Sequence, residues 1–297
     1  MEIPNLNSIT SEKKSPEYVN PTYEKTRRKE RFLEKYRQRE KMTSNGNEKN
    51  ESFEFEYIDI SPEKVTGKDI FIAVGTPSNW EQMEDFVFDL LESGHRVTAL
   101  AHPNSNLKES FGYDPKIKRP LAMQTFFEKK QLSDVTVIAH SYGLIDTVRK
   151  GTDGIGRIVA INPAGLSENN PLDHFLSSLK SIKNALLSDS KAYQKTYIGL
   201  IKSLLRQQPL ELIKQIRDVG SADLEEEVKK IAKMLVILRN NDDSLLPPKK
   251  ATKYPFRELT TGGDHLGPFL QSDQVQEIIQ TITKLEKSTT KEKISEE

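Results

Sequence analysis

The chain of 297 residues contains no cysteine and no long apolar run. The absence of cysteine excludes disulfides, thiolate metal sites and a cysteine nucleophile, and it favours a reducing compartment. The longest apolar runs, such as IFIAV at 70–74, are far shorter than the ~20 residues of a membrane-spanning helix. The first 30 residues also lack the apolar segment of a secretory signal. We therefore predict a soluble, cytoplasmic protein with no membrane span.

An excess of charge of one sign is also missing, because Lys and Arg total 44 and Asp and Glu total 44. This balance argues against nucleic acid or an anionic membrane as a partner of the whole surface. No His, Asp or Glu pair stands at metal-ligand spacing with a third partner, and neither GxxxxGK[ST] nor GxGxxG occurs. The glycines of GTDGIGR (151–157) precede an apolar run, so we predict a loop there. We expect no metal and no cofactor.

Short apolar runs alternate with helical patterns from residue 53 onward. Alternating apolar and acidic residues at 53–60 predict a half-exposed strand. Further strands are predicted at 69–74, 96–100, 135–140, 157–161, 234–239 and 256–261, and the middle ones are apolar on both faces, as in covered parallel strands. Helical spacing occurs at 80–94 and 273–287. The alternation predicts an α/β fold with a doubly wound, mostly parallel sheet.

The alternation is interrupted between Gly165 and Lys233, where strand signals disappear. Three or four amphipathic helices are predicted in this segment, with stripes of leucine, isoleucine and aromatic residues. A helical insertion at the carboxyl edge of a sheet covers the place where such sheets bind ligands. We therefore predict an all-helical cap at 167–233. The core is then formed by 51–166 and 234–287, and residues 288–297 form a charged tail.

The first 50 residues differ from the rest and are predicted to form a disordered, charged extension that contains one basic helix. Within it, residues 22–42 are rich in helix formers and contain nine Lys or Arg and four Glu. Their apolar residues Phe32, Leu33 and Tyr36 make only a short stripe. We predict a solvated basic helix followed by a linker at 43–52. The minority alternative is an arm that docks on an anionic surface.

A serine stands at the end of the strongest predicted strand, in VTVIAHSYG (135–143). A serine hydroxyl is a poor nucleophile at neutral pH and needs a base and oxyanion donors. A sharp strand-to-helix turn exposes such a serine, and it requires small residues two positions before and after it. Ala139 and Gly143 stand at those positions around Ser141. This pattern favours a nucleophile; the alternative is an ordinary turn capped by serine.

An acid and a histidine follow Ser141 in the order that this architecture uses. The strand at 234–239 ends in two acids, of which Asp243, four residues before Pro247, is the better candidate and Asp242 is the alternate. His265 stands in a glycine-rich loop between the last predicted strand and the last helix. Read alone, the acids fit a solvated turn and His265 fits a surface loop. Together with Ser141 they predict a catalytic triad.

Two backbone N–H groups are needed to bind the oxyanion. The residue after the nucleophile supplies one, which is Tyr142 here. The turn VGTPSNW, directly after the strand at 69–74, is predicted to supply the other through Thr76. Trp80 in the same turn is a candidate for the pocket lining. The alternative is a simple Gly-Thr-Pro turn.

These motifs together resemble the α/β-hydrolase fold superfamily with a helical cap. The resemblance covers roughly residues 53–287 and rests on four motifs, AHSYG (139–143), NPAGL (162–166), NNDDSLLPP (240–248) and GGDHLGP (262–268). It implies that His265 takes the proton of Ser141, that Asp243 orients His265, and that water hydrolyses an acyl-enzyme. Where many relatives have a His-Gly pair in the oxyanion turn, this chain has Val74-Gly75.

The resemblance implies a serine hydrolase acting on a carboxylic ester or related small acyl compound, with an apolar acyl pocket under the cap. A C–C hydrolase, a thioesterase and an aminopeptidase use the same apparatus. A non-catalytic binding protein of the same fold is the alternative from another class. His102 follows the strand at 96–100 and is a further pocket candidate, although a structural role is favoured. We expect His140 to be structural and His95 to lie at the surface.

Overall fold

The computed structural model describes most of the sheet and the helices that cover it. Its described residues are 21–38, 40–44, 52–75, 83–100, 115–166, 180, 183, 187, 194, 197, 198, 201, 209–240, 243, 246, 257–261, 265, 269, 275 and 277–282. The two flanking segments of the sequence and much of 167–208 lie outside these residues.

Strands and helices alternate along the described chain. In order they are α1 (Pro21–Arg37), β1 (Glu40–Ser44), β2 (Phe53–Ile60), β3 (Asp69–Ala73), α2 (Glu84–Glu92), β4 (Arg96–Leu100), α3 (Pro115–Lys129), β5 (Val135–His140), α4 (Gly143–Lys150), β6 (Ile155–Ile161), α7 (Pro209–Ser221), α8 (Glu225–Lys230), a 3-10 helix (Ala232–Met234), β7 (Leu235–Asn240) and β8 (Arg257–Thr261). Residues 275 and 277–282 are helical. Each strand predicted from the sequence is present, within two residues at either end.

The strands form one eight-stranded sheet in the order β1-β2-β4-β3-β5-β6-β7-β8. β2 pairs antiparallel with β1 and β4, and the remaining pairs, from β4-β3 to β7-β8, are parallel. The mostly parallel sheet is therefore confirmed. Parallel pairing brings the carboxyl ends of β3, β5, β6, β7 and β8 to one edge, where ligands bind in such sheets.

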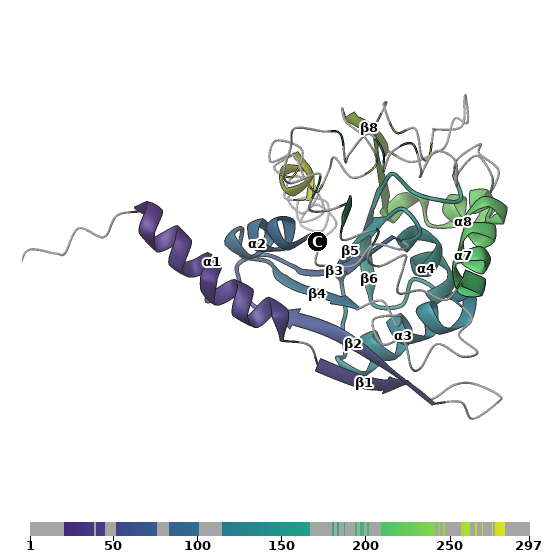
Figure 1. Ribbon diagram of the computed structural model, residues 1–297. Helices are drawn as coiled ribbons and strands as arrows, with labels where there is room; N and C mark the ends of the chain where they lie inside the picture. The colour runs from purple at the N-terminus through teal and green to yellow at the C-terminus, as the bar shows by residue number, and fades with distance from the viewer. Residues whose placement is uncertain are drawn as a thin grey trace, which may run out of the picture.

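Helices cover both faces of this sheet (Figure 1). Successive residues of a strand point to opposite faces. In β3, Ile70 and Ile72 belong to one core cluster, which includes residues of α1, α2 and the last helix. Phe71 and Ala73 belong to the other, with residues of α3 and α4. Burial on both faces is the reason why the middle strands are apolar throughout.

The basic helix α1 is shorter than predicted, and although most of its described side chains are exposed, one stripe of it is buried against the core. It ends at Arg37, and Phe32 and Tyr36 are 6% and 3% exposed in the core cluster that includes α2. The ring of Phe32 lies 5.2 Å from that of Phe88 on α2. The prediction of a solvated helix was wrong, because a short apolar stripe is enough to bind a helix to the core when a neighbouring helix has a matching apolar face.

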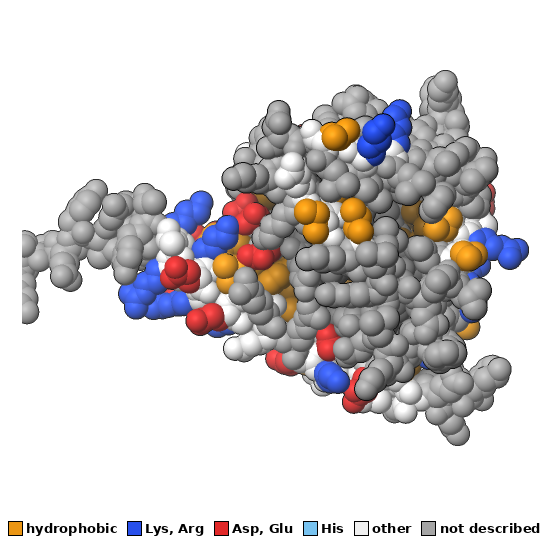
Figure 2. All heavy atoms as spheres, in the orientation of Figure 1, with side chains coloured by type: hydrophobic (Ala, Val, Ile, Leu, Met, Phe, Trp, Pro, Cys, Tyr) orange, Lys and Arg blue, Asp and Glu red, His pale blue; other side chains and the backbone are white. Residues whose placement is uncertain are grey.

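The charges of α1 also have partners within the protein. Lys29 lies 2.7 Å from Asp85, and Arg28 lies 3.4 Å from Glu92, both on α2. Basic and acidic side chains are interspersed where these helices meet (Figure 2). Acidic residues of α2 thus pair with some of the basic residues of α1, which the sequence analysis considered as an arm for docking on an anionic surface.

Several further predictions require correction. Residues 43 and 44, assigned to a linker, belong to β1, which pairs with β2. β6 begins at Ile155, inside the predicted loop 151–157. His95 is 2% exposed, and its Nδ1 accepts a hydrogen bond from the N–H of Lys68 at 3.1 Å. Helix α3 was not predicted, because Pro120 interrupts its pattern.

The cap is only partly described. α7 and α8 coincide with the last two helices predicted for 167–233. The earlier cap helices lie mainly outside the described residues, and the division of the chain into extension, core, cap and tail stays a prediction. In the part of the chain that the structure describes, no helix has the length and apolarity needed to span a bilayer.

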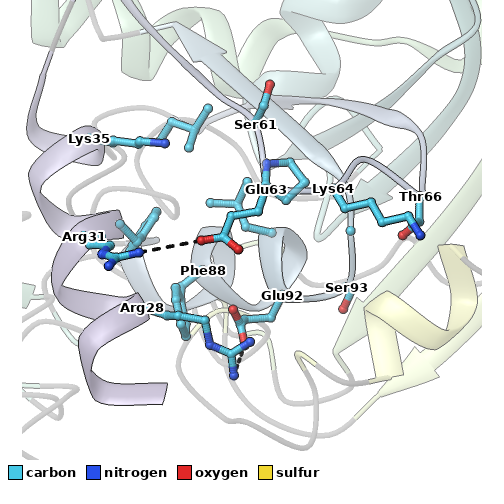
Figure 3. A pocket seen from close by; sticks show the side chains of 15 residues that line it. Arg28, Arg31, Lys35, Ser61, Glu63, Lys64, Thr66, Phe88, Glu92 and Ser93 are labelled. Atoms are coloured by element: carbon cyan, nitrogen blue, oxygen red, sulfur yellow. Dashed lines mark ion pairs between the residues drawn. The ribbon is translucent and has the colours of Figure 1, made fainter. Parts of the chain in front are cut away.

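A pocket of about 460 Å³ lies between α1, the segment 60–66 and α2 (Figure 3). Apolar side chains of Phe32, Ile60 and Phe88 line it, together with charged residues that pair across it. Arg31 lies 3.7 Å from Glu63, and Arg28 lies 3.4 Å from Glu92. None of the predicted triad residues lines this pocket.

Candidate active site

The turn between β5 and α4 places Ser141 at the carboxyl edge of the sheet. Ser141 has a φ of 52°, which non-glycine residues seldom adopt, and it is 7% exposed. Its N–H donates to the carbonyl of Ile161 at 3.0 Å, and its own carbonyl accepts from the N–H of Ala164 at 3.0 Å. These bonds tie the strained turn to the end of β6 and to the segment that follows it.

Gly143 is required by the close approach of this turn to β3. A Cβ added there would collide with the carbonyl oxygen of Ala73. Ala139, two residues before the serine, is completely buried. The small residues that the sequence placed around Ser141 therefore stand where the backbone is most crowded, as a sharp strand-to-helix turn requires.

Asp243 and His265 form a buried hydrogen-bonded pair after β7 and β8. Nδ1 of His265 lies 2.7 Å from Oδ2 of Asp243, and the two residues are 6% and 3% exposed. Oδ1 of Asp243 accepts from the N–H of Leu246 at 3.0 Å. A carboxylate only accepts hydrogen bonds, so Nδ1 of His265 carries the proton and Nε2 is the basic nitrogen. The alternate acid, Asp242, lies outside the described residues.

Asn162 holds the loop that carries His265, a role that sequence reasoning missed. Its Nδ2 donates to the carbonyl of His265 at 3.2 Å, and its Oδ1 accepts from the N–H of Asn240 at 2.9 Å. Asn162 is 2% exposed and has a φ of 43°, a region that asparagine tolerates better than most residues. The asparagine at the head of NPAGL was the available signal.

His140 contacts the same carbonyl group of His265 and is structural, as expected. Its Nε2 lies 3.2 Å from the carbonyl oxygen of His265, so Nε2 carries the proton. The two rings lie 4.8 Å apart, and the ring of Phe269 lies 4.7 Å from that of His140. Complete burial, together with the charge of His265, lowers the pKa of His140 to about 3. His140 is therefore neutral at physiological pH.

Of the two predicted oxyanion donors, Tyr142 lies among the described residues and Thr76 does not. Among the described residues, the backbone N–H of Tyr142 has no acceptor. Gly75 lies against the serine, since an added Cβ would be 2.8 Å from Cβ of Ser141. The first residues after β3 therefore approach Ser141. Thr76, Trp80 and His102 lie outside the described residues.

The side chain of Tyr142 enters a buried polar network that the sequence did not suggest. Its hydroxyl donates to Oδ2 of Asp218 on α7. Arg149 on α4 donates to both oxygens of Asp218, at 2.7 and 2.9 Å, and Lys116 lies 3.0 Å from Oδ1. Burial alone raises the pKa of Asp218, but its bonds with Arg149, Tyr142 and Lys116 outweigh burial and lower it. This network joins α7, which lies in the predicted cap segment, to the residue that follows Ser141.

The fold thus brings Ser141, Asp243 and His265 to one edge of the sheet, at the ends of β5, β7 and β8. The ring of His265 packs against the residue directly before Ser141. A buried acid-histidine pair and a serine in a left-handed turn are the groups that the predicted triad requires, and the triad itself stays a prediction. Within the described residues, no group of three or more His, Cys, Asp or Glu is arranged to hold a metal ion.

Comparison with known proteins gives similarity in structure and none in sequence. No protein-family model matches the chain. No curated protein matches it. A bromoperoxidase from Bacillus anthracis matches with a TM-score of 0.63 and 16% identity, over 82% of this chain and 100% of that one.

Two esterases match in the same way. The esterase from Exiguobacterium antarcticum has a TM-score of 0.62 and 13% identity, over 82% of this chain and 99% of that one. A thermophilic esterase from Thermogutta terrifontis has a TM-score of 0.56 and 14% identity, over 83% and 98%. At such identities the likeness concerns the fold. The strand order and these matches together establish that the chain has the α/β-hydrolase fold.

Proposed function

We propose that the protein is a serine hydrolase that cleaves carboxylic esters with apolar acyl groups. The observation that carries this proposal is the buried hydrogen bond between His265 and Asp243 beside the elbow of Ser141. A buried carboxylate at Nδ1 fixes the neutral tautomer in which Nε2 can accept a proton, and it stabilises the imidazolium that then forms. A histidine with only a structural role has no need of this tautomer at the sheet edge.

In the proposed first step, Oγ of Ser141 attacks the carbonyl carbon of the ester and its proton passes to Nε2 of His265. The negative charge that develops on the carbonyl oxygen is bound by the backbone N–H groups of Tyr142 and Thr76. The C–O bond to the alcohol then breaks, and the alcohol leaves with the proton of His265. Ser141 retains the acyl group as an ester.

In the second step, His265 takes a proton from water, and the hydroxide formed attacks the acyl-enzyme. Collapse of this intermediate returns the proton to Ser141 and releases a carboxylic acid. No metal or cofactor takes part in either step. The apolar stripes of the cap segment support an apolar acyl group, and the esterases among the structural matches support an ester rather than another acyl bond.

A fluorophosphonate probe tests the nucleophile directly, because it phosphonylates an activated serine. We expect the wild type to be labelled and Ser141→Ala to remain unlabelled. His265→Ala should lower the rate of labelling by at least about 100-fold, the usual contribution of a general base. Ser167→Ala, which changes a serine in the predicted cap, serves as the matched control and should be labelled like the wild type.

Hydrolysis of p-nitrophenyl esters of increasing chain length tests the substrate class. We expect kcat/KM to rise from acetate to medium-chain esters and to vanish in Ser141→Ala. A folded wild type that neither reacts with the probe nor hydrolyses any ester would instead identify a non-catalytic binding protein. Hydrolysis of thioesters or aminoacyl amides in preference to esters would retain the mechanism and change the substrate.

A further inference from the structure

The guanidinium group of Arg119, on α3, contacts three separate parts of the proposed oxyanion site. Its Nε and Nη2 lie 2.7 and 2.6 Å from Oδ2 of Asp146 on α4. Nη2 also donates to the carbonyl oxygen of Val74 at 2.8 Å. The central carbon of the group lies 4.9 Å from the centroid of the Tyr142 ring. We propose that Arg119 is a positioning residue. It holds the two proposed oxyanion donors in fixed positions relative to each other, an inference that rests on the proposed function.

The contact with Val74 fixes the turn that follows β3. Val74 is two residues before Thr76, whose N–H is one of the two proposed donors. The intervening Gly75 lies directly against the elbow, because an added Cβ would be 2.8 Å from Cβ of Ser141 and 3.2 Å from Nδ1 of His140. The turn is therefore held between Arg119 on one side and the serine on the other. Loss of the guanidinium would free it to shift relative to Ser141.

The contacts with Tyr142 and Asp146 fix the elbow itself. Tyr142 supplies the other proposed donor, and its ring is held by Arg119 while its hydroxyl is bound by Asp218. Asp146 stands on the first turn of α4, three residues after Gly143. One side chain thus joins the turn after β3 to the residue and the helix that follow the nucleophile. An oxyanion site needs this precision, because its donors must be about 3 Å from the developing charge.

Burying the ion pair of Arg119 and Asp146 costs free energy, which argues that the pair does not serve mainly to stabilise the fold. Arg119 and Asp146 are 8% and 4% exposed, and Oδ1 of Asp146 has no hydrogen-bond partner among the described residues. A buried ion pair with an unsatisfied oxygen stabilises a fold no better than apolar side chains of the same size. A planar group with several fixed donors, in contrast, orients two acceptors at once.

The test compares Arg119→Met and Arg119→Lys with the wild type in hydrolysis of the best p-nitrophenyl ester. We expect kcat to fall by about 10- to 100-fold in Arg119→Met, somewhat less than on loss of a complete oxyanion donor. KM should stay within about threefold, because ground-state binding is unchanged. Arg119→Lys retains the positive charge but loses the planar guanidinium group with its several fixed donors, so its kcat should be intermediate.

Arg96→Met is the matched control. Arg96 on β4 also donates to a carboxylate through two nitrogens, at 2.9 and 2.8 Å from the oxygens of Asp59, but it stands at the amino end of its strand. The change in side chain is the same and an ion pair of similar geometry is lost. We expect a kcat close to that of the wild type.

An alkyl trifluoromethyl ketone separates positioning from a general loosening of the site. Its carbonyl carbon accepts Oγ of Ser141, the serine proton passes to His265, and the adduct carries an oxyanion. We expect Arg119→Met to weaken its inhibition by the factor lost in kcat. The matching secondary alcohol lacks the carbonyl and should inhibit both proteins equally.

Three results would contradict the inference or its basis, and they are distinguishable. A folded Arg119→Met with wild-type kcat, while Ser141 is labelled in both proteins, overturns the positioning role alone. Equal weakening of the ketone and the alcohol also overturns it, because the whole pocket has then changed. A wild type whose Ser141 is inert overturns the proposed function and the inference with it. If Arg119→Met does not fold, Arg119→Lys decides.

Discussion

Nδ1 of His265 lies 2.7 Å from Oδ2 of Asp243, and the two residues are separated by 22 positions in the chain. β7 and β8 are adjacent and parallel, so the loops after them emerge at the same sheet edge. Among the described residues, Asp243 is thus the acid that contacts His265, and its role as the acid of the triad stays a prediction.

Asp243→Asn should lower kcat by about 10³- to 10⁴-fold, because the amide favours the wrong tautomer of His265. Its stability should change little, since the asparagine oxygen still accepts the N–H of Leu246. Steady-state kinetics on a p-nitrophenyl ester measure the loss, with Asp242→Asn as the neighbouring control. The assignment of the acid is wrong if Asp242→Asn is the inactive variant.

His140 should make the wild type less stable in acid. Its pKa is lowered to about 3 by burial and by His265, whereas an unfolded histidine titrates near 6.5. A lowered pKa contributes stability above 6.5 that is lost as the pH falls. The contribution changes by about 1.4 kcal/mol for each pH unit below 6.5.

His140→Gln retains a donor for the carbonyl of His265 and removes the titration. Urea unfolding at pH 7.5 and 5 measures the free energy of unfolding of both proteins. At pH 7.5 the variant should be the less stable, because the ring packing is lost. That deficit should shrink at pH 5, and an unchanged deficit would show that His140 does not titrate in this range.

Asp146 should have the opposite effect on stability. Burial raises its pKa to about 6, although Arg119 and Arg149 lower it and Asp218 raises it further. A raised carboxyl pKa contributes stability that is complete below the unfolded value and is lost as the pH rises to 6. Asp146→Asn removes this loss.

Relative to the wild type, Asp146→Asn should therefore gain about 1.4 kcal/mol for each pH unit between 4.5 and 6, and nothing more above that. Urea unfolding at pH 4.5, 6 and 7.5 measures the difference. Asp153→Asn, which changes a surface carboxylate, is the control and should show no such trend. A difference that is independent of pH would place the pKa of Asp146 outside this window.

Gly143→Ala should destabilise the protein by about 1–3 kcal/mol, the usual cost of overpacking. The new Cβ would collide with the backbone of Ala73, so α4 and β3 must separate. Separation moves the elbow, and kcat should fall as well. In Gly156→Ala the nearest atom is the exposed carboxylate of Asp134, which can swing away, so this control should cost less. Equal effects of the two variants would contradict the argument.

Phe32→Ala should destabilise the protein by about 3 kcal/mol, the lower part of the range for buried phenylalanine. The reason is its packing against Tyr36 and Phe88, both at 5.2 Å. Glu30→Ala, on the exposed side of the same helix, should stay within about 0.5 kcal/mol of the wild type. Chemical denaturation measures both. No loss in Phe32→Ala would restore the picture of a solvated helix.

Local patterns sufficed to predict most of the fold. The alternation of short apolar runs and helical stripes depends on nearest neighbours along the chain, and it located every strand except β1. β1 and α3 were not predicted, because they are stabilised by contacts with residues far away in the sequence. β1 is polar on its exposed side and forms only by pairing with β2, and α3 contains a proline whose cost is offset by the burial of Met123 and Phe126.

The sequence by itself determined the sheet, the elbow around Ser141 and the order of serine, acid and histidine. These features depend on residue size and on backbone geometry over a few positions. Tertiary structure alone decided that Asp243 binds His265, that Asn162 and His140 contact the carbonyl of His265, and that Arg119 contacts Val74, Asp146 and Tyr142. Each of these contacts joins residues far apart in sequence, and they meet because parallel pairing brings the ends of several strands to one edge.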